Sequence, residues 1–361
     1  MTKLFEPIRV RELEIRNRIF MAPMCQYSCE EKDGVPAQWH LVHYGARATG
    51  GAGMIIVEAT AVSPEGRISP WCTGIWNEEQ VAAWKPINDF CHSQGAKTAV
   101  QLAHAGRKAS TYRSWSGVNS IPISDGGWQT VSSTSEAFTD YAAPRELETS
   151  EIPEIVNQWV ESAKRSMRAG FDAIEIHAAH GYLIHQFLSP ITNRRTDQYG
   201  GSLENRARLL LEIVRGIRAA IGPDAPLMIR FSATDYREDG WDEAQTAEVA
   251  SWCAEAGADL FDISSGGLIT GVQIPFTERG YQVKFAEYVG ERVDEPVSAV
   301  GMIWDGPQAE AILQTGNVEV ISIGRAFLRD PYWALRAAHE LGVEVDYWQN
   351  QDQRGKFPYP S

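Results

Sequence analysis

The sequence predicts an α/β fold, a single (β/α)8 barrel in which parallel strands alternate with helices. Two observations predict this fold. First, a helical pattern, a glycine, a short polar link and a β-rich run recur in that order, with the helix-ending glycines at positions 95, 170, 257 and 316. Second, the chain contains eight candidate strands, the number that closes such a barrel. Its length of 361 residues suits one large barrel with insertions.

The candidate strands are short apolar runs rich in β-branched residues. They cover residues 19–24, 54–58, 98–102, 173–177, 227–232, 260–263, 297–300 and 318–323. Most are followed by a segment with apolar residues at helical spacing, for example residues 204–221 and 243–255. A doubly wound open sheet uses the same alternation, but it usually opens with a glycine-rich phosphate turn. No G-x-G-x-x-G motif follows residues 19–24, so the barrel is the better prediction.

Three segments lie outside the repeat, although we expect one domain over residues 1–361. Short alternating runs in residues 8–15 predict an N-terminal hairpin that plugs the barrel bottom. Residues 106–148, rich in Ser, Thr, Gly and aromatic side chains, form a long insertion after the third strand. Long loops on a compact barrel are often lids or subunit contacts. Residues 343–361 form a C-terminal tail that could also contact a second subunit.

The composition is that of a soluble globular protein, with 43% hydrophobic and 22% charged residues. A formal net charge of −14 repels phosphate backbones, so we expect no nucleic-acid partner. The first residues lack the apolar centre of a signal peptide, and no uncharged apolar stretch could span a bilayer, which predicts a cytoplasmic protein without membrane contact. Five cysteines without a C-x-x-C pair predict reduced thiols rather than a disulfide framework or a zinc ribbon.

Three polar rings follow the fourth candidate strand. His177, His180 and Tyr182 leave the end of the run 173–177 together. Two imidazoles three residues apart can direct two hydrogen-bond donors at one acceptor, and a nearby phenol can supply a proton. This equipment suits the polarisation and protonation of a carbonyl compound. Two core histidines and a packing tyrosine would be the alternative, which the grouping at a strand end disfavours.

Other polar groups stand at the carboxyl ends of the predicted strands, where barrel enzymes place their active sites. Glycines after strands seven and eight predict a phosphate cradle, and Arg325 could pair with the phosphate or lie on the surface. The amide of Gln101 can both donate to and accept from a pyrimidine edge. Arg230, inside a strand, needs an electron-rich ring atom, as a reduced flavin offers, or a structural salt bridge with Glu175 or Asp262.

Eight motifs, in order along nearly the whole chain, resemble those of one family. They are Leu4-Phe5-Glu6-Pro7, Asn17-Arg18-Ile19, Ala22-Pro23-Met24-Cys25-Gln26-Tyr27, Ile56-Val57-Glu58-Ala59-Thr60-Ala61-Val62, Gln101-Leu102-Ala103-His104-Ala105-Gly106-Arg107-Lys108, His177-Ala178-Ala179-His180-Gly181-Tyr182 with Arg195-Thr196-Asp197-Gln198-Tyr199-Gly200-Gly201-Ser202, and Gly324-Arg325-Ala326. The chain is similar to the old yellow enzymes, FMN-dependent ene reductases on a (β/α)8 barrel. Within them it resembles the cysteine-containing, thermophilic-like branch that includes the xenobiotic reductases.

The resemblance implies non-covalent FMN, with NADPH or NADH as reductant. It places FMN on Ala22, Pro23, Met24, Cys25, Ala59, Gln101, Arg230, Gly301, Gly324 and Arg325. It places the substrate on Tyr27, His177, His180 and Tyr182. The implied activity is reduction of the C=C bond of small α,β-unsaturated carbonyl compounds. The nicotinamide cofactor first reduces FMN and leaves, and the enone then occupies the same pocket, which is a ping-pong order.

The resemblance also implies a role for each catalytic residue. His177 and His180 would donate hydrogen bonds to the carbonyl oxygen while hydride passes from flavin N5 to the β-carbon. Tyr182 would protonate the α-carbon as the general acid. Cys25, beside the flavin, would tune the redox potential and the affinity for substrate, and Tyr27 would contact the substrate.

The habit of the family implies a homodimer or a homotetramer. Some members of the branch place an arginine or a tryptophan from a neighbouring subunit's C-terminal tail in the active site. In this tail Arg354, Phe357 and Tyr359 are candidates, with no secure assignment among them. The insertion around Trp115 and Trp128 departs from the family pattern, since no counterpart aligns with it.

A metal-dependent barrel hydrolase is the alternative function, with His177 and His180 as half of a metal site. The chain lacks a His-x-His on its first strand and a His-Glu-x-x-His helix, so no metal is expected. It also has no cysteine after Cys253 that could hold an iron–sulfur cluster, as related enzymes with further domains do.

Overall fold

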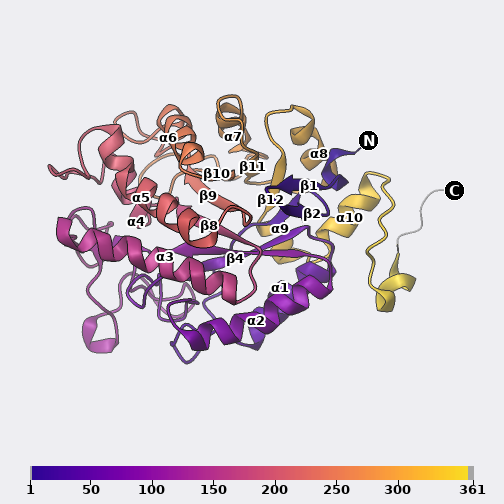
Figure 1. Ribbon diagram of the computed structural model, residues 1–361, viewed down its shortest axis with the longest axis horizontal. Helices are drawn as coiled ribbons and strands as arrows, with labels where there is room; N and C mark the ends of the chain where they lie inside the picture. Colours follow the sequence, from indigo (N-terminus) through magenta and orange to yellow (C-terminus); the bar gives the residue numbers. More distant parts are fainter. Residues whose placement is uncertain (1, 357–361) are drawn as a thin grey trace.

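Eight parallel strands close into a barrel at the centre of the computed structural model, which describes residues 2–356 (Figure 1). The strands are β3 (Ile19–Met21), β4 (Met54–Ala61), β5 (Lys97–Ala103), β8 (Ala173–Ala178), β9 (Leu227–Ser232), β10 (Leu260–Ser264), β11 (Val297–Val300) and β12 (Val320–Ile323). All of their residues except Lys97 are buried, because helices cover the barrel outside and side chains fill it inside. The last strand pairs with the first, with Ile321 opposite Ile19. The predicted closed barrel is confirmed, and the open sheet is excluded.

A β-bulge makes β4 longer than the sequence predicts. The register of β4 on β5 shifts between Val57 and Ala59, and the strand continues to Ala61 instead of ending at residue 58. The bulge places Ala59 opposite Gln101 and turns Glu58 toward the helix that precedes β4. There the Glu58 carboxylate accepts hydrogen bonds from the Tyr44 hydroxyl at 3.0 Å and from the Gln26 N–H at 2.9 Å. A bulge of this kind leaves no clear mark on an apolar run, so the sequence pattern missed it.

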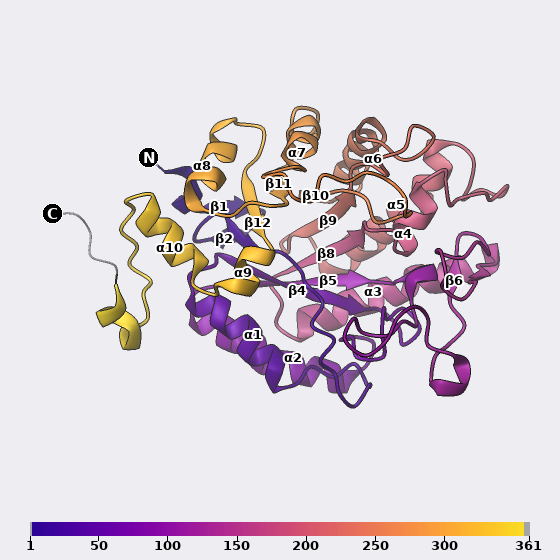
Figure 2. The same ribbon diagram turned by 180° about the vertical axis from the view of Figure 1, so that it is seen from behind.

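Helices pack around the barrel wall (Figures 1 and 2). They are α1 (Gln38–Thr49), α2 (Glu78–Ser93), α3 (Ile152–Arg168), α4 (Leu183–Leu188), α5 (Leu203–Ile221), α6 (Glu243–Glu255), α7 (Val283–Gly290), α8 (Gly306–Gln314), α9 (Arg325–Arg329) and α10 (Trp333–Glu340). Several start at a polar side chain that accepts a backbone N–H of the first turn, as Asp242 does from Gln245. Within residues 2–356, no helix is both long enough and apolar enough to cross a bilayer.

The N-terminal hairpin closes the bottom of the barrel. Strands β1 (Ile8–Val10) and β2 (Leu13–Ile15) pair antiparallel, with Ile8 opposite Ile15. Their apolar side chains form one cluster with residues from the amino ends of the barrel strands. These residues are Phe20, Met54, Ile56, Ala99, Ala173, Met228, Leu260 and Val320. The prediction of a hairpin that plugs the barrel is confirmed.

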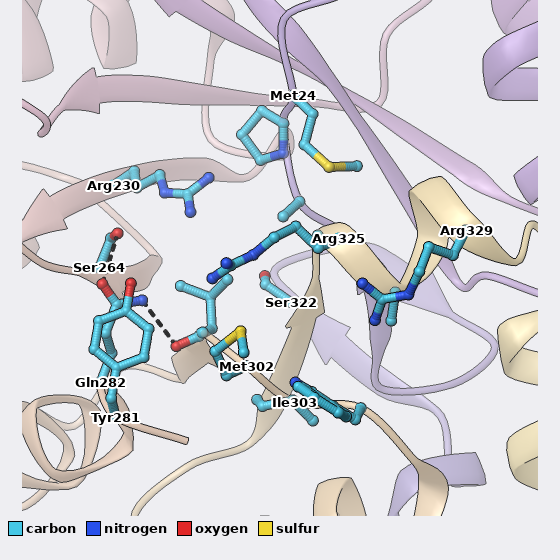
Figure 3. A pocket seen from close by; sticks show the side chains of 17 residues that line it. Met24, Arg230, Ser264, Tyr281, Gln282, Met302, Ile303, Ser322, Arg325 and Arg329 are labelled. Carbon is cyan, nitrogen blue, oxygen red and sulfur yellow. Dashed lines mark hydrogen bonds between the residues drawn. The ribbon is translucent and has the colours of Figure 1, made fainter. Parts of the chain in front are cut away.

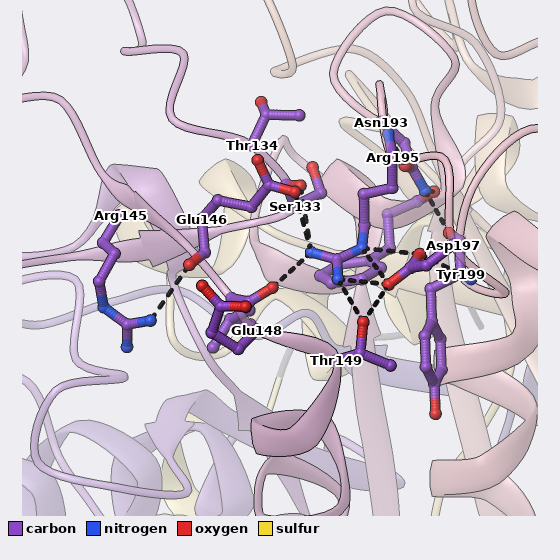
Figure 4. A network of polar contacts seen from close by, with 12 residues as sticks. Ser133, Thr134, Arg145, Glu146, Glu148, Thr149, Asn193, Arg195, Asp197 and Tyr199 are labelled. Atoms are coloured by element: carbon purple, nitrogen blue, oxygen red, sulfur yellow. Dashed lines mark hydrogen bonds and ion pairs between the residues drawn. The ribbon is translucent and has the colours of Figure 1, made fainter.

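The insertion after β5 is held against the barrel by a buried arginine. It contains the short elements η2 (Gly106–Lys108), η3 (Ile123–Asp125), β6 (Val131–Ser132) and β7 (Arg145–Glu146), and η4 (Thr149–Glu151) follows it directly. From the loop after α4, Arg195 donates to the Leu147 carbonyl at 2.5 Å and pairs with Asp197 at 2.6 Å (Figure 4). The hydrogen bond from Arg195 lowers the pKa of Asp197 to about 2. The motif that begins at Arg195 therefore anchors the end of the insertion.

The C-terminal tail packs on the opposite side of the molecule from the insertion (Figures 1 and 2). Arg16 lies 4.4 Å from the centre of the Tyr347 ring, and the Asn17 amide donates to the Tyr347 hydroxyl at 3.1 Å. The tail continues into η5 (Asn350–Gly355), where Arg354 is exposed. The other two candidates for entry into a neighbouring site, Phe357 and Tyr359, lie outside the described residues. Entry of Arg354 into a neighbouring site stays a prediction.

We expect the hairpin plug to contribute measurably to stability. Ile15 is 1% exposed beneath the barrel, so Ile15→Ala leaves a cavity and should lower the free energy of unfolding by about 2–5 kcal/mol. The exposed neighbour Glu14, on the same strand, offers the control, because Glu14→Ala should change it by less than about 0.5 kcal/mol. Urea denaturation followed by tryptophan fluorescence measures both variants. Equal stability of the two would show that the plug contributes nothing.

Candidate active site

A cavity of about 210 Å³ opens at the carboxyl ends of the strands on one side of the barrel (Figure 3). It lies where β12 meets β3, and β9, β10 and β11 complete its wall. Most of the residues that the sequence assigned to FMN line it. These are Ala22, Pro23, Met24, Arg230, Gly301, Gly324 and Arg325. The structure therefore brings together groups from the beginning, the middle and the end of the chain.

One end of the cavity combines bare backbone with two guanidinium groups. Gly301 has φ of +113°, and a Cβ at this position would lie 2.5 Å from the Gln282 amide nitrogen, so a side chain does not fit there. Arg325 and Arg329, one turn apart on α9, both line the cavity, and Arg325 points into it in Figure 3. Such an arrangement could hold a phosphate group. Arg329 was not predicted, although its four-residue spacing from Arg325 was a usable signal.

At the other end, Arg230 forms an ion pair and also lines the cavity, so its position is compatible with both roles that the sequence left open. Its Nε lies 3.3 Å from the Asp262 carboxylate, which is the expected structural ion pair. The same side chain also lines the cavity, where a cation could face an electron-rich ring atom. Met24 and Val300 supply apolar wall between the two charged ends. An anionic cofactor with a flat ring system, such as FMN, therefore fits the residues that are present.

Three of the predicted FMN residues lie beside this cavity and do not line it. Ala59 pairs with Gln101 across β4 and β5, and the Gln101 amide N–H donates to a carboxyl oxygen of Glu175 at 2.7 Å. Cys25 follows the cavity-lining run at Pro23 and Met24. Ala59 and Cys25 belong to one apolar cluster with Tyr27 and Tyr182. A second cavity, of about 480 Å³, opens next to this cluster beneath the insertion and is lined by both tyrosines.

The histidines and Tyr182 lie together at the carboxyl end of β8. His177 is the register partner of Arg230, which places its ring next to the first cavity. The Nε2 of His177 lies 3.4 Å from the Nδ1 of His180, and the Tyr182 ring centre lies 4.9 Å from that of His177. The backbone supports this bend: His180 has φ of +59°, and its N–H donates to the Ser232 hydroxyl at 2.9 Å. The predicted grouping of three polar rings is thus a real cluster in space.

Gly181, within this bend, is required by close packing. Its φ is +74°, and a Cβ would lie 2.4 Å from the Gly267 carbonyl oxygen. Its N–H donates to the His185 Nδ1 at 2.9 Å, and His185 Nε2 lies 3.0 Å from the buried Asp235 carboxylate. Lys108, from the insertion, donates to both the His180 carbonyl and the Gly267 carbonyl at 2.8 Å. These contacts fix the bend from both sides.

Burial sets the protonation of the three rings. It lowers the pKa of His177 and of His180 well below the usual value, and the positive charge of Arg230 lowers both further. Both imidazoles are therefore neutral near pH 7. Burial raises the pKa of Tyr182 well above its ordinary value, so the phenol keeps its proton. Burial and, secondly, Arg107 lower the pKa of Lys108 to about 7.

Cys25 is a thiol at neutral pH. Burial and the negative charge of Glu58 raise its pKa to about 12. Its sulfur is hydrogen-bonded to the Tyr27 hydroxyl, whose own pKa is raised chiefly by Cys25. Tyr27 has φ of +51° and contacts Trp115 of the insertion edge to face, with ring centres 6.0 Å apart. The insertion therefore reaches the proposed substrate side of the site.

Sequence reasoning gave no role to several residues that the structure places at the site. Ser264 lines the first cavity, and its hydroxyl lies 2.7 Å from His180 Nε2. Gln282 lines the same cavity from a loop, where no strand pattern could indicate it. Both Ser264 and Lys108 could have been predicted from the sequence. Ser264 is at the end of a strand, and Lys108 is the last residue of the motif at residues 101–108. Among residues 2–356, no three or more His, Cys, Asp or Glu side chains are grouped so that they could hold a metal ion.

Comparison with known proteins agrees with this geometry. Residues 3–344 match the model of the NADH:flavin oxidoreductase / NADH oxidase family. The NADPH dehydrogenase of Bacillus subtilis (strain 168) is 45% identical over 344 residues, which cover 95% of this chain and 96% of that protein. Morphinone reductase in complex with tetrahydroNAD superposes with a TM-score of 0.78 at 31% identity, covering 99% of this chain and 97% of the other.

A larger enzyme contains the same fold as one part. A solved 2-naphthoyl-CoA reductase complex gives a TM-score of 0.84 at 28% identity, over 94% of this chain but 52% of that one. This chain therefore spans about half the length of that reductase. None of these matches favours a metal-dependent hydrolase. The chain belongs to the NADH:flavin oxidoreductase / NADH oxidase family, that of the old yellow enzymes, and is thus an FMN-dependent oxidoreductase.

Proposed function

We propose that the protein is an NAD(P)H-dependent ene reductase, which reduces the C=C bond of α,β-unsaturated carbonyl compounds in a ping-pong order. One observation carries this proposal above the others. The nitrogens of His177 and His180 converge to 3.4 Å beside a cavity that fits FMN, with the Tyr182 phenol against the same imidazole. Two converging N–H groups can donate to one carbonyl oxygen, and a protonated phenol beside them can give its proton to the α-carbon of the same compound.

The residues that would hold FMN form two groups, one that would bind its phosphate and one that would contact its ring system. Arg325, Gly301 and Gly324 would bind the phosphate. Arg230 and Gln101 would face the ring, with Ala22, Pro23, Met24, Cys25 and Ala59 along its edge and face. When bound, FMN supplies the hydride, taken from NAD(P)H and delivered from N5 to the β-carbon of the enone.

The protein's own groups would do the rest of the chemistry. His177 and His180 hold the carbonyl oxygen by two N–H donors and stabilise the negative charge that develops on it. Because both imidazoles are neutral, substrate binding does not have to remove water from a charged ring. Tyr182 gives its proton to the α-carbon as the general acid, and Tyr27, which packs against the same apolar cluster as Tyr182, contacts the substrate. The insertion, through Trp115 on Tyr27, helps to exclude water.

The first prediction from the proposed function concerns the cofactor and the reaction. The purified protein, reconstituted with FMN, should show the flavin absorbance bands after gel filtration. Anaerobic reduction with NADPH or NADH should bleach these bands, and 2-cyclohexenone should restore them. A protein that retains no FMN would overturn the assignment of the cavity, whereas bound FMN that enones fail to reoxidise would overturn the ene reductase alone.

The second prediction separates the two halves of the ping-pong cycle. Tyr182→Phe removes the proton donor, so enone should reoxidise the reduced enzyme about a hundredfold more slowly or worse. Reduction by NAD(P)H needs no proton from Tyr182 and should change by no more than a few-fold. Stopped-flow absorbance measures both half-reactions in the same preparation, so each serves as the control for the other. Equal slowing of both would remove Tyr182 from this role.

The third prediction follows from the protonation of Cys25. With its pKa near 12, Cys25 should react with iodoacetamide at pH 8 about a thousandfold more slowly than an unperturbed thiol. Glu58→Gln removes a charge that raises this pKa and should speed the reaction. Peptide mass spectrometry of the native, FMN-loaded protein gives the rate at Cys25, with glutathione as the reference thiol. Alkylation of Cys25 at the rate of glutathione would contradict the assignment.

A further inference from the structure

The two active-site imidazoles are close enough to bond to each other. His177 Nε2 and His180 Nδ1 lie 3.4 Å apart, and both rings are neutral near pH 7. A neutral imidazole has one N–H donor and one acceptor nitrogen. A direct bond between the rings therefore needs a donor on one of them and an acceptor on the other. A shared carbonyl oxygen, in contrast, needs donors on both.

The backbone decides which tautomer His177 adopts. The Ala179 N–H donates to His177 Nδ1 at 3.3 Å, so this nitrogen is the acceptor. The single proton of His177 is then on Nε2, which faces His180. In the direct hydrogen bond, His177 Nε2–H donates to His180 Nδ1, and the single proton of His180 is on Nε2. His180 Nε2 lies 2.7 Å from the Ser264 hydroxyl, which accepts it.

The Ser264 hydroxyl has a second partner that allows it to reverse. Gln282 donates its amide N–H to the Val300 carbonyl at 3.0 Å, so its amide oxygen must face the serines (Figure 3). That oxygen lies 3.2 Å from the Ser264 hydroxyl and 2.6 Å from the Ser265 hydroxyl. Because Ser265 also satisfies the amide oxygen, Ser264 can turn its proton from Gln282 to His180 and leave no buried acceptor unpaired.

We propose that Ser264 is a positioning residue that lets His180 exchange tautomers when a carbonyl oxygen binds between the two imidazoles. In the direct bond, Ser264 accepts from His180 Nε2–H and donates to Gln282. In the carbonyl complex, Ser264 donates to Nε2, and Nδ1–H points at the substrate. Water at the half-buried ring takes the proton from Nε2 and returns one to Nδ1, so the ring stays neutral. The inference rests on the proposed function, because that function supplies the acceptor.

The charged groups around His180 disfavour a doubly protonated imidazole. A change of tautomer is therefore the way in which His180 can provide an N–H donor to the carbonyl oxygen beside that of His177. Arg230, His177, Lys108 and His185 are the cationic or titratable groups whose charges act on the ring. The positive charges of Arg230 and Lys108 oppose protonation of the imidazole, as burial does. A doubly protonated His180 is therefore disfavoured at neutral pH. A neutral ring gains an Nδ1 donor when it gives up its Nε2 donor, and Nε2 then needs a new donor opposite it.

The test uses the oxidised, FMN-loaded protein labelled with ¹⁵N-histidine, with 2-cyclohexenone as the probe and no nicotinamide. The ¹⁵N shifts of His180, identified by their loss in His180→Gln, report which nitrogen carries the proton. We expect Nδ1 to be the acceptor without enone and the donor with it. The shifts of His177 should keep Nε2 as the donor throughout.

Variants at Ser264 provide the matched comparison. Ser264→Ala removes one neutral hydrogen bond to Nε2 in the complex, so the Kd for 2-cyclohexenone should rise about three- to tenfold. Ser264→Thr keeps a hydroxyl at the same place and should bind within about twofold of the original protein. Flavin absorbance confirms that each variant is folded and loaded.

Two results would overturn the proposal while the ene reductase stands. One is a His180 that keeps Nδ1 unprotonated in the enone complex. The other is a Ser264→Ala variant that binds enone as tightly as the original protein. If, instead, enone neither binds nor reoxidises the reduced enzyme, the proposed function fails and this inference fails with it.

Discussion

The hydrogen bonds that join the last strand to the first are the constraint on which the site depends. Ile321 lies opposite Ile19, and beyond the ladder the Ala22 N–H still donates to the Ile323 carbonyl at 3.0 Å. This closure brings the run after β3 against Gly324 and Arg325, about three hundred residues later in the chain. Because all eight strands are parallel, their carboxyl ends share one rim. The polar residues that follow separate strands therefore meet there.

Inside the barrel, the side chains form layers of different character. The hairpin and the first inward residues make an apolar floor, and above it lie Glu175, Arg230 and Asp262. This layer holds two carboxyl groups for one guanidinium group. Burial raises the pKa of Glu175 to about 8 and also raises that of Asp262, so a proton takes the place of a second cation. The charges of this layer, which lies beneath the cavity, are therefore largely compensated.

The sequence was sufficient for the fold and for the residues at strand ends, for a physical reason. Continuous apolar runs and glycine caps are local signals, and parallel closure converts a position at a strand end into a position in the site. The sequence was not sufficient where a residue's position depends on contacts with distant parts of the chain. The bulge that turns Glu58 outward lies within an apolar run, and Gln282 enters from a loop. Arg230 had two interpretations because its partner Asp262 is on another strand; the ion pair is present, and the contact with a flavin stays a prediction.

The same desolvation separates the roles of the three rings. For an imidazole, burial disfavours the charged form, so His177 and His180 stay neutral. For a phenol, burial disfavours the anion, so Tyr182 keeps the proton that the proposed reaction would pass to carbon. Arg230 strengthens the first effect from the adjacent strand. Each neutral imidazole has a single N–H donor. In the proposed reaction, the site must therefore control which of the two ring nitrogens carries the proton. For His177 a backbone N–H on Nδ1 sets it, and for His180 the hydroxyl of Ser264 faces the nitrogen that must change.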